Sequence, residues 1–225
     1  MLPNIFDFVI CLHIFQYALI LAIIKIKYEN LYSKLSELTE IYNGLQVYTT
    51  VITGKNKYSR TLLQLTTIRR NYAVLSDICD DISQLYGVSI LFSLTYAFGI
   101  IVYYSYLAIS NSIIDIHEKS FIYTIDAVLP LIGAVLAVTA ICVLANDVIA
   151  QMRKVIDVIY QLLNVRNFHR EIKTELEIFA LEVSHREISF QACSMFSIDC
   201  GLLGSIFSVT ATYLILLLQF YGSSK

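Results

Sequence analysis

The sequence predicts an all-α membrane protein with four transmembrane helices and long cytoplasmic helical extensions. Apolar residues make up 57% of the 225 positions and charged residues 15%, whereas soluble domains average about 45 to 50% and about 25%. Four stretches each hold about 20 mostly apolar residues, the length that crosses a hydrocarbon core of roughly 30 Å as a helix. The polar segments between them carry apolar residues at helical spacing, so helices are also expected outside the membrane.

The four apolar stretches set the order of the membrane helices. They run from about Phe8 to Ile24, Gly87 to Ser110, Phe121 to Ala145 and Cys200 to Tyr221. The third contains Asp126 and, one turn later, Pro130, which a membrane helix tolerates where neighbouring helices satisfy the freed carbonyl. No basic residue precedes the first stretch and no small-residue cleavage site follows it, so we expect a permanent span rather than a removable signal peptide.

Lysine and arginine are distributed unequally between the spans. None precedes the first span, eight lie between the first and second, one lies between the second and third, six lie between the third and fourth, and one follows the fourth. Basic residues accumulate in loops that stay in the cytoplasm. We therefore expect the two long connections in the cytoplasm and both ends of this chain outside.

The two long connections are predicted to be helical because apolar residues recur in them every three or four positions. The first series is Leu31, Leu35, Leu38, Tyr42 and Leu45, followed after a turn-like stretch at 53–57 by Leu65, Ile68, Tyr72, Leu75, Cys79, Ile82 and Tyr86. The second is Ile149, Met152, Ile156, Ile159 and Leu163, followed after a polar break at 164–170 by Ile172, Leu176, Phe179, Val183 and Phe190. Two explanations stay open: packing within one subunit, or additional contacts between subunits.

No catalytic, metal or cofactor site is expected. The sequence contains neither GxSxG nor GxxxxGK[ST], and His185 is not part of an HExxH motif. The five cysteines form no CxxC pair, which argues against a zinc site or a disulfide framework. A net charge of −2 leaves no basic surplus for nucleic acid. Asp77, Asp80 and Asp81 are interpreted as a solvated charged face, so the sequence predicts that the protein is not an enzyme.

Polar side chains inside the apolar stretches are the candidate functional residues, because each costs free energy unless it faces protein or water. His13 and Gln16 share a face of the first span, where an interhelical hydrogen bond and a ligand contact both explain them. Asp126 lies near the outer end of the third span. Two explanations stay open for it: a carboxylate that reaches the membrane interface, or a group that binds a ligand. Gln219 closes the apolar run LILLLQF.

The end of the chain resembles the insect gustatory receptor family. Residues 212–220 read TYLILLLQF and match at every position the TYhhhhhQF signature that closes the last span of these receptors. Its defined positions are Thr212, Tyr213, Gln219 and Phe220. The chain just before this span also resembles the family, at His185, Phe190, Phe196 and Asp199. The four spans and long cytoplasmic helices are similar to the last four spans of that seven-span family. We therefore expect a C-terminal portion, a short isoform or a truncated gene model.

The resemblance implies a gustatory receptor subunit of the plasma membrane of chemosensory neurons. Such a subunit forms a tastant-gated cation channel, in which four like or related subunits surround a central pore, and it mediates taste-driven acceptance or avoidance. The partners implied are the lipid bilayer, a small-molecule tastant, other subunits and permeating cations. The alternative is a non-conducting four-span membrane protein that packs with or regulates a related channel subunit.

The resemblance also divides the chain into segments. We expect the first span in residues 1–27, a cytoplasmic helical hairpin in 28–86, the second span in 87–110 and a short outer loop in 111–120. The third span is expected in 121–148, cytoplasmic anchor-like helices in 149–194, and the fourth, pore-lining span with a short outer tail in 195–225.

The pore residues are expected on one face of the last span. Counting back from Gln219 by three, four, seven and eight positions gives one helix face that holds Leu216, Ile215, Thr212 and Ala211. A ring of apolar side chains closes a narrow pore by excluding water, and neutral amides near it solvate a passing cation. We expect Ile215, Leu216, Gln219 and Phe220 as gate and pore lining, and Tyr213 against a neighbouring helix. The alternative for Gln219 is a polar group that joins two helices.

The ligand pocket implied by the resemblance lies among the outer halves of the other spans. The candidates are Phe8, Cys11, His13 and Phe15 on the first span, Phe98, Tyr103, Tyr104 and Tyr106 on the second, and Tyr123, Thr124 and Asp126 on the third. Aromatic walls with a few polar groups suit a small organic tastant. The alternative for each tyrosine is the aromatic belt at the membrane interface.

Overall fold

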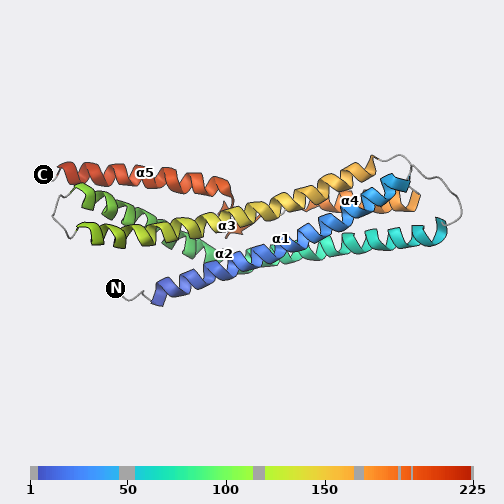
Figure 1. Ribbon diagram of the computed structural model, residues 1–225, viewed down its shortest axis with the longest axis horizontal. Coiled ribbons are helices and arrows are strands. Elements are labelled where there is room, and N and C mark those ends of the chain that lie inside the picture. The colour runs from blue at the N-terminus through green and yellow to red at the C-terminus, as the bar shows by residue number, and fades with distance from the viewer. Residues whose placement is uncertain are drawn as a thin grey trace. The chain divides into compact units, whose positions relative to one another are not determined.

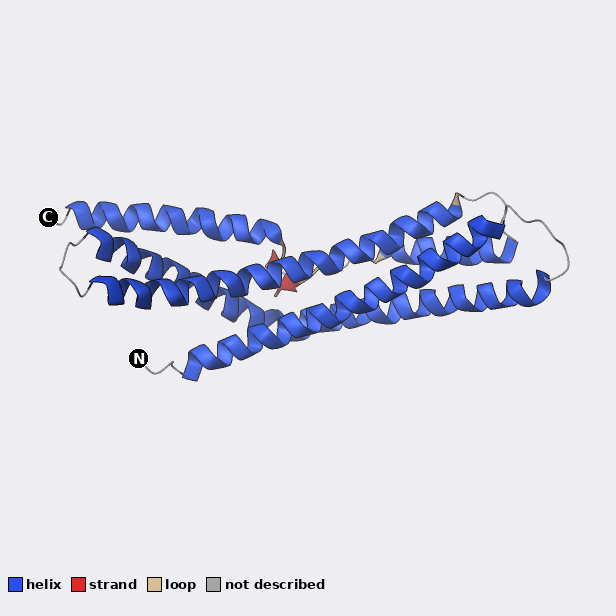
Figure 2. Cartoon of the chain, in the orientation of Figure 1, coloured by secondary structure: helices blue, strands red, loops and turns tan. Residues whose placement is uncertain are grey.

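The computed structural model describes residues 5–45, 54–113, 120–164, 170–186, 189–193 and 195–223. In that part of the chain, helices and one short hairpin follow each other (Figures 1 and 2). They are α1 (Ile5–Leu45), α2 (Gly54–Ile113), α3 (Ser120–Leu163), α4 (Arg170–His185), β1 (Gln191–Ala192), β2 (Phe196–Ser197) and α5 (Cys200–Ser223). Four of the helices, α1, α2, α3 and α5, are long and apolar enough to cross a membrane, which confirms the expected fold class.

Helices α1, α2 and α3 continue without interruption from an apolar stretch into a polar one. With 41, 60 and 44 residues, each is about two to three times as long as a membrane crossing requires. The polar segments continue the helix because they keep the 3–4 apolar spacing and contain no proline. Pro130, near the start of α3, does not end that helix.

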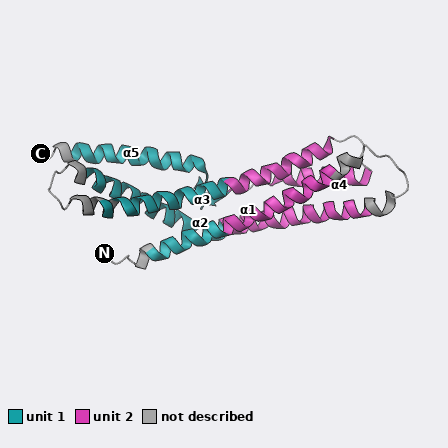
Figure 3. Ribbon diagram, viewed as in Figure 1, with its two compact units in different colours: residues 1–19, 84–146, 190–225 teal, residues 20–83, 147–189 magenta. Residues whose placement is uncertain are grey.

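The chain divides into two compact units, shown in teal and magenta in Figure 3. Unit 1 comprises residues 1–19, 84–146 and 190–225, and unit 2 comprises residues 20–83 and 147–189. Unit 1 holds nearly all of the four apolar stretches, whereas unit 2 holds the polar segments with helical stripes. The boundaries of unit 1 at 19, 84 and 146 compare with expected span ends at 27, 87 and 148.

The core of unit 2 consists of the striped residues. Those buried are Leu31, Leu35, Leu65, Ile68, Tyr72, Leu75, Cys79, Met152, Ile159, Ile172, Leu176, Phe179 and Val183. Three rings from α1, α2 and α4 meet edge to face, with centroid distances of 5.8 Å between Tyr28 and Tyr72 and 5.6 Å between Tyr72 and Phe179. Such pairs add to the free energy gained from apolar burial. Packing within one subunit therefore accounts for most of both stripes.

Two details of the stripes were wrong. Phe190 was expected on the last helical stripe, but α4 ends at His185 and Phe190 lies in extended chain, where its carbonyl accepts a hydrogen bond of 2.8 Å from the amide of Ile198. Phe190 is still fully buried, so its burial, rather than a helix, explains its position in the pattern. Residues 54–57, expected as part of a turn, form the beginning of α2.

A short hairpin leads into α5. Strands β1 and β2 are antiparallel, with Gln191 opposite Ser197 and Ala192 opposite Phe196, and Cys193 in the turn has a φ of 52°. Gly87 of α2 lies against this turn, because a β-carbon built there would be 3.1 Å from the amide nitrogen of Cys193. The neighbouring atom is backbone, which shifts less easily than the end of a side chain, so the close approach favours glycine at this position.

We predict that Gly87→Ala lowers the melting temperature of the protein, whereas Gly99→Ala raises it. Alanine is favoured over glycine inside a helix by up to about 1 kcal/mol, and Gly99 has open space around it. At Gly87 the added methyl group lies only 3.1 Å from the backbone of the hairpin, and the cost of displacing that backbone exceeds the gain. Thermal unfolding of both variants in detergent tests this, and an equal rise for both would show that the hairpin does not pack closely on α2.

Candidate functional site

The predicted pore face of α5 is uncovered within this subunit. Among residues 200–220, only Thr210 is buried. Ile215 is 57% exposed, Leu216 44% and Phe220 74%, and Gln219 is also exposed. These side chains lie on or next to the helix face that the sequence assigns to the pore.

The side of α5 next to this face contacts α2. The ring of Tyr213 meets that of Phe98 edge to face, at a centroid distance of 6.3 Å, so Tyr213 packs against a neighbouring helix as expected. Within the described chain, Gln219 forms no hydrogen bond. Its alternative role, joining two helices of one subunit, therefore has no contact to support it here.

Asp199 caps the start of α5. Its Oδ1 accepts a hydrogen bond of 3.1 Å from the amide of Leu202, and its Oδ2 accepts one of 2.8 Å from the hydroxyl of Ser197. The Ser197 hydroxyl, followed by the backbone amides of Leu202 and Gly201, lowers the pKa of Asp199. The carboxylate thus remains charged at the helix end where negative charge is favourable. Through it, strand β2 and α5 are joined.

The predicted pocket residues all belong to unit 1. Tyr103 and Tyr104 contact each other edge to face, at 5.1 Å between centroids. Most of the described candidates on α1 and α3 are exposed, namely Phe8, Cys11, Phe15 and Asp126, and the half-buried ones are His13, Phe98, Tyr104 and Tyr106. His13 has a buried Nδ1 without a hydrogen-bond partner in the described chain. The side chains of Tyr123 and Thr124 lie outside the described residues, and the pocket stays a prediction.

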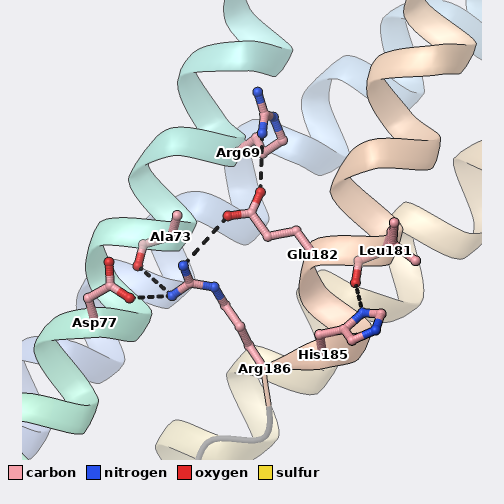
Figure 4. Close-up of polar contacts among 7 residues, drawn as sticks. All are labelled: Arg69, Ala73, Asp77, Leu181, Glu182, His185 and Arg186. Atoms are coloured by element: carbon pink, nitrogen blue, oxygen red, sulfur yellow. Dashed lines mark hydrogen bonds and ion pairs between the residues drawn. The ribbon is translucent and has the colours of Figure 1, made fainter.

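An ion-pair network in unit 2 fastens α4 to α2 (Figure 4). Arg69 donates from Nε to Glu175 over 2.7 Å. It also donates from Nη1 to Glu182 over 3.2 Å, as Figure 4 shows. Just beyond the end of α4, Arg186 donates to the Asp77 carboxylate and, over 3.2 Å, to the carbonyl of Ala73. The hydrogen bond to Asp77 is the main cause of the raised pKa of Arg186.

This network was not predicted from the sequence. Asp77 was interpreted as part of a solvated charged face and is indeed exposed, and it also pairs with Arg186, which is 109 positions away in the chain. The sequence does contain one signal, because Glu175 and Glu182 are seven residues apart and therefore share a face of α4. Nothing local indicated that this face meets Arg69.

A second ion pair joins α1 and α3. Lys25 Nζ lies 2.7 Å from Asp147 Oδ2, and Gln151 donates to Glu29 over 3.3 Å. Lys25 and Asp147 are the first charged residues after the apolar runs of their helices. The contact therefore brings the polar ends of these two runs to the same level.

Four helices that are long and apolar enough to cross a membrane define a multi-pass membrane protein. The family model for the 7tm chemosensory receptor matches residues 1–221, and the chain belongs to this family. The expectation of an insect chemoreceptor is thereby confirmed.

Relatives and a solved structure agree with this. Over 146 residues the chain is 28% identical to the Drosophila melanogaster protein named "Putative gustatory receptor 28b", covering 63% of this chain and 31% of that protein. Over 54 residues it is 37% identical to "Putative gustatory receptor 2a" of the same organism, covering 24% of this chain and 13% of that protein. The chain thus spans less than a third of the length of either relative.

The olfactory receptor OR5 of the insect Machilis hrabei, solved in complex with eugenol, shares the fold. The TM-score is 0.57 at 12% sequence identity, and the match covers 94% of this chain and 68% of that receptor. The likeness supports the arrangement of four long helices with extensions beyond the membrane.

We predict that Arg69→Gln destabilises the protein by about 1.5 kcal/mol. Glu175 and Glu182 would lose their shared cation, and hydrogen bonds to charged groups contribute about 1.5 to 3 kcal/mol. The Arg69 side chain is 29% exposed, which places the loss at the lower end. The measurement is the free energy of unfolding in detergent, followed by circular dichroism.

The matched control is Lys173→Gln, which removes one charge from an exposed pair on α4 whose atoms are 3.9 Å apart. Such pairs contribute at most about 1 kcal/mol, so the control is expected to stay within about 0.5 kcal/mol of the unmodified protein. Equal losses for the two variants would show that the network does not hold α4.

Proposed function

We propose that the chain is a gustatory receptor subunit that forms, with like or related subunits, a tetrameric tastant-gated cation channel in the plasma membrane of chemosensory neurons. The observation that carries the proposal is the uncovered face of α5, which ends in Gln219 in a chain of the chemosensory receptor family. In a tetramer such a face meets the same face of other copies. In this proposal unit 2 lies in the cytoplasm, which the distribution of basic residues supports.

The gate in this proposal is the last two turns of α5. Ile215 and Leu216 form an apolar ring that excludes water when the four helices are close together. Gln219 lies about 4.5 Å further along the helix axis than Leu216, on the same face. Four amide oxygens at that level solvate a cation without the strong binding that carboxylates would cause. Phe220 is highly exposed and marks the end of the pore.

The tastant in this proposal binds among the outer parts of α1, α2 and α3. The ring pair of Tyr103 and Tyr104 offers a flat apolar surface, and the exposed carboxylate of Asp126 suits sugar hydroxyls or a basic group. The olfactory receptor OR5 was solved with eugenol, a small organic molecule. Contact between Phe98 and Tyr213 provides a route by which a ligand-induced shift of α2 reaches α5.

We predict that Gln219→Ala changes the permeability ratio among monovalent cations, or the unitary conductance, without lowering surface expression. The amide ring would be lost while the exposed position avoids any cost in packing. The neighbouring Leu218→Ala, which is turned by about 100° around the helix, is the matched control and is expected to keep both properties. Patch-clamp recording is made with this chain expressed alone and together with a full-length gustatory receptor.

Two outcomes would count against the proposal. Unchanged permeation in Gln219→Ala would remove this residue from the pore. Surface expression without tastant-evoked current under either condition would favour the alternative, a non-conducting four-span protein that packs with or regulates a related subunit.

A further inference from the structure

A groove between α1 and α2 of unit 2 is not explained by the proposed channel function. Its volume is about 830 Å³, within the range of roughly 300 to 1,000 Å³ typical of ligand sites. The lining residues all belong to unit 2 and are Ile20, Ile23, Ile24, Lys27, Asn30, Leu31, Lys34, Asn71, Val74, Leu75, Ile78 and Ile82.

The lining is apolar and basic. Eight of the twelve lining residues are aliphatic, two are lysines and two are asparagines, and none is acidic. Within the described chain, neither Lys27 nor Lys34 forms an ion pair, in contrast to the nearby Lys25, which is bound to Asp147. The groove therefore suits an occupant with an apolar part and a negative charge.

The groove lies where the apolar run of α1 ends. Ile20, Ile23 and Ile24 precede Lys25, the first charged residue after that run, whereas the lysines of the groove follow it. Lys27 lies about 4.5 Å and Lys34 about 15 Å beyond Ile24 along the helix axis. Because side chains tilt toward the N-terminus of their helix, both lysines lean back toward the apolar end. The headgroup layer on each side of a bilayer is roughly 5 to 7 Å thick, so both amines can approach it.

We propose that this groove binds an anionic phospholipid from the adjoining leaflet. An acyl chain lies on the isoleucines of α1 and on Ile78 and Ile82 of α2, and the headgroup phosphate accepts hydrogen bonds from Lys27 and Lys34. If the basic connections are cytoplasmic, the adjoining leaflet is the one rich in anionic lipids. The bound lipid joins α1 to α2 at the membrane boundary and stabilises unit 2.

The test uses the full chain in nanodiscs made of phosphatidylcholine alone or of equal parts of phosphatidylcholine and phosphatidylserine. Lipid retained after detergent extraction is counted by native mass spectrometry, and the melting temperature is measured in both discs. Lipid retention does not depend on current or on a tastant. A failure of this inference is therefore distinguishable from a failure of the proposed function.

Two groove variants are compared with two matched controls. Lys27→Gln with Lys34→Gln removes both charges of the groove, and Arg153→Gln with Lys154→Gln removes two exposed charges of α3 outside it. Val74→Trp fills the groove without changing charge, and Ile178→Trp adds the same bulk at an exposed position of α4.

The unmodified chain and both controls are expected to retain phosphatidylserine and to melt at a higher temperature in the mixed discs. The double lysine variant is expected to lose its preference for phosphatidylserine about 30-fold, from the usual contribution of two lysines near an anionic surface, and Val74→Trp is expected to lose the retained lipid. Retention by the lysine variant equal to that of the unmodified chain would overturn the inference. Equal losses of lipid in the control variants would also overturn the inference. The same holds if the groove retains no lipid and its variants change the oligomeric state instead.

Discussion

A peptide group in hydrocarbon has no water to bond with, so each backbone N–H and C=O of a spanning segment must be satisfied within its own helix. This constraint fixes the four apolar stretches as helices. In α1, α2 and α3 the same helix then continues into a polar segment, because no proline interrupts it and the apolar stripe persists. Because these helices are continuous, the direction of each membrane helix determines which of its residues in unit 2 face the neighbouring helices.

In unit 2, side-chain contacts hold α4 against the long helices. Helix α4 has only 16 residues, and isolated helices of this length are marginal in water. Its apolar face buries Phe179 against Tyr72, and its polar face binds Arg69 through Glu175 and Glu182. The partly buried ion pairs fix the orientation of α4 as well as its contact. A glutamate moved away from Arg69 would lose its hydrogen bonds, and few water molecules could replace them there.

The parts of the fold that follow from periodicity could be predicted from the sequence, and those that follow from long-range contact could not. A 3–4 spacing is a local property, so α2 was expected as one helix from Leu65 into the second span. The pairing of Asp77 with Arg186 joins residues 109 positions apart, for which no local pattern exists. Phe190 fits the helical spacing by position, yet it is buried through a hairpin, because spacing reports burial and leaves the backbone conformation open.

The candidate site shows the same division. Helical geometry alone placed Ile215, Leu216 and Gln219 on one face of α5, whereas the contact of Tyr213 with Phe98 required the structure to identify its partner. The predicted tastant pocket draws on three helices, and the sequence contains no signal for how their outer ends meet. The groove beside Lys27 and Lys34 was likewise not predicted, since its two walls are separated by more than 30 positions in the chain.

Of the four apolar helices, α5 is the least buried within this subunit. Its first turn is fixed, because Asp199 binds the Leu202 amide and the Ser197 hydroxyl. Further along, Tyr213 meets Phe98, and beyond that point the predicted gate residues are largely exposed. Segments with few buried contacts have the lowest local stability and are the ones that move in switching proteins. A helix that is capped at one end and sparsely packed at the other can shift its last turns while its base stays in place, which is what a gate at Ile215 and Leu216 requires.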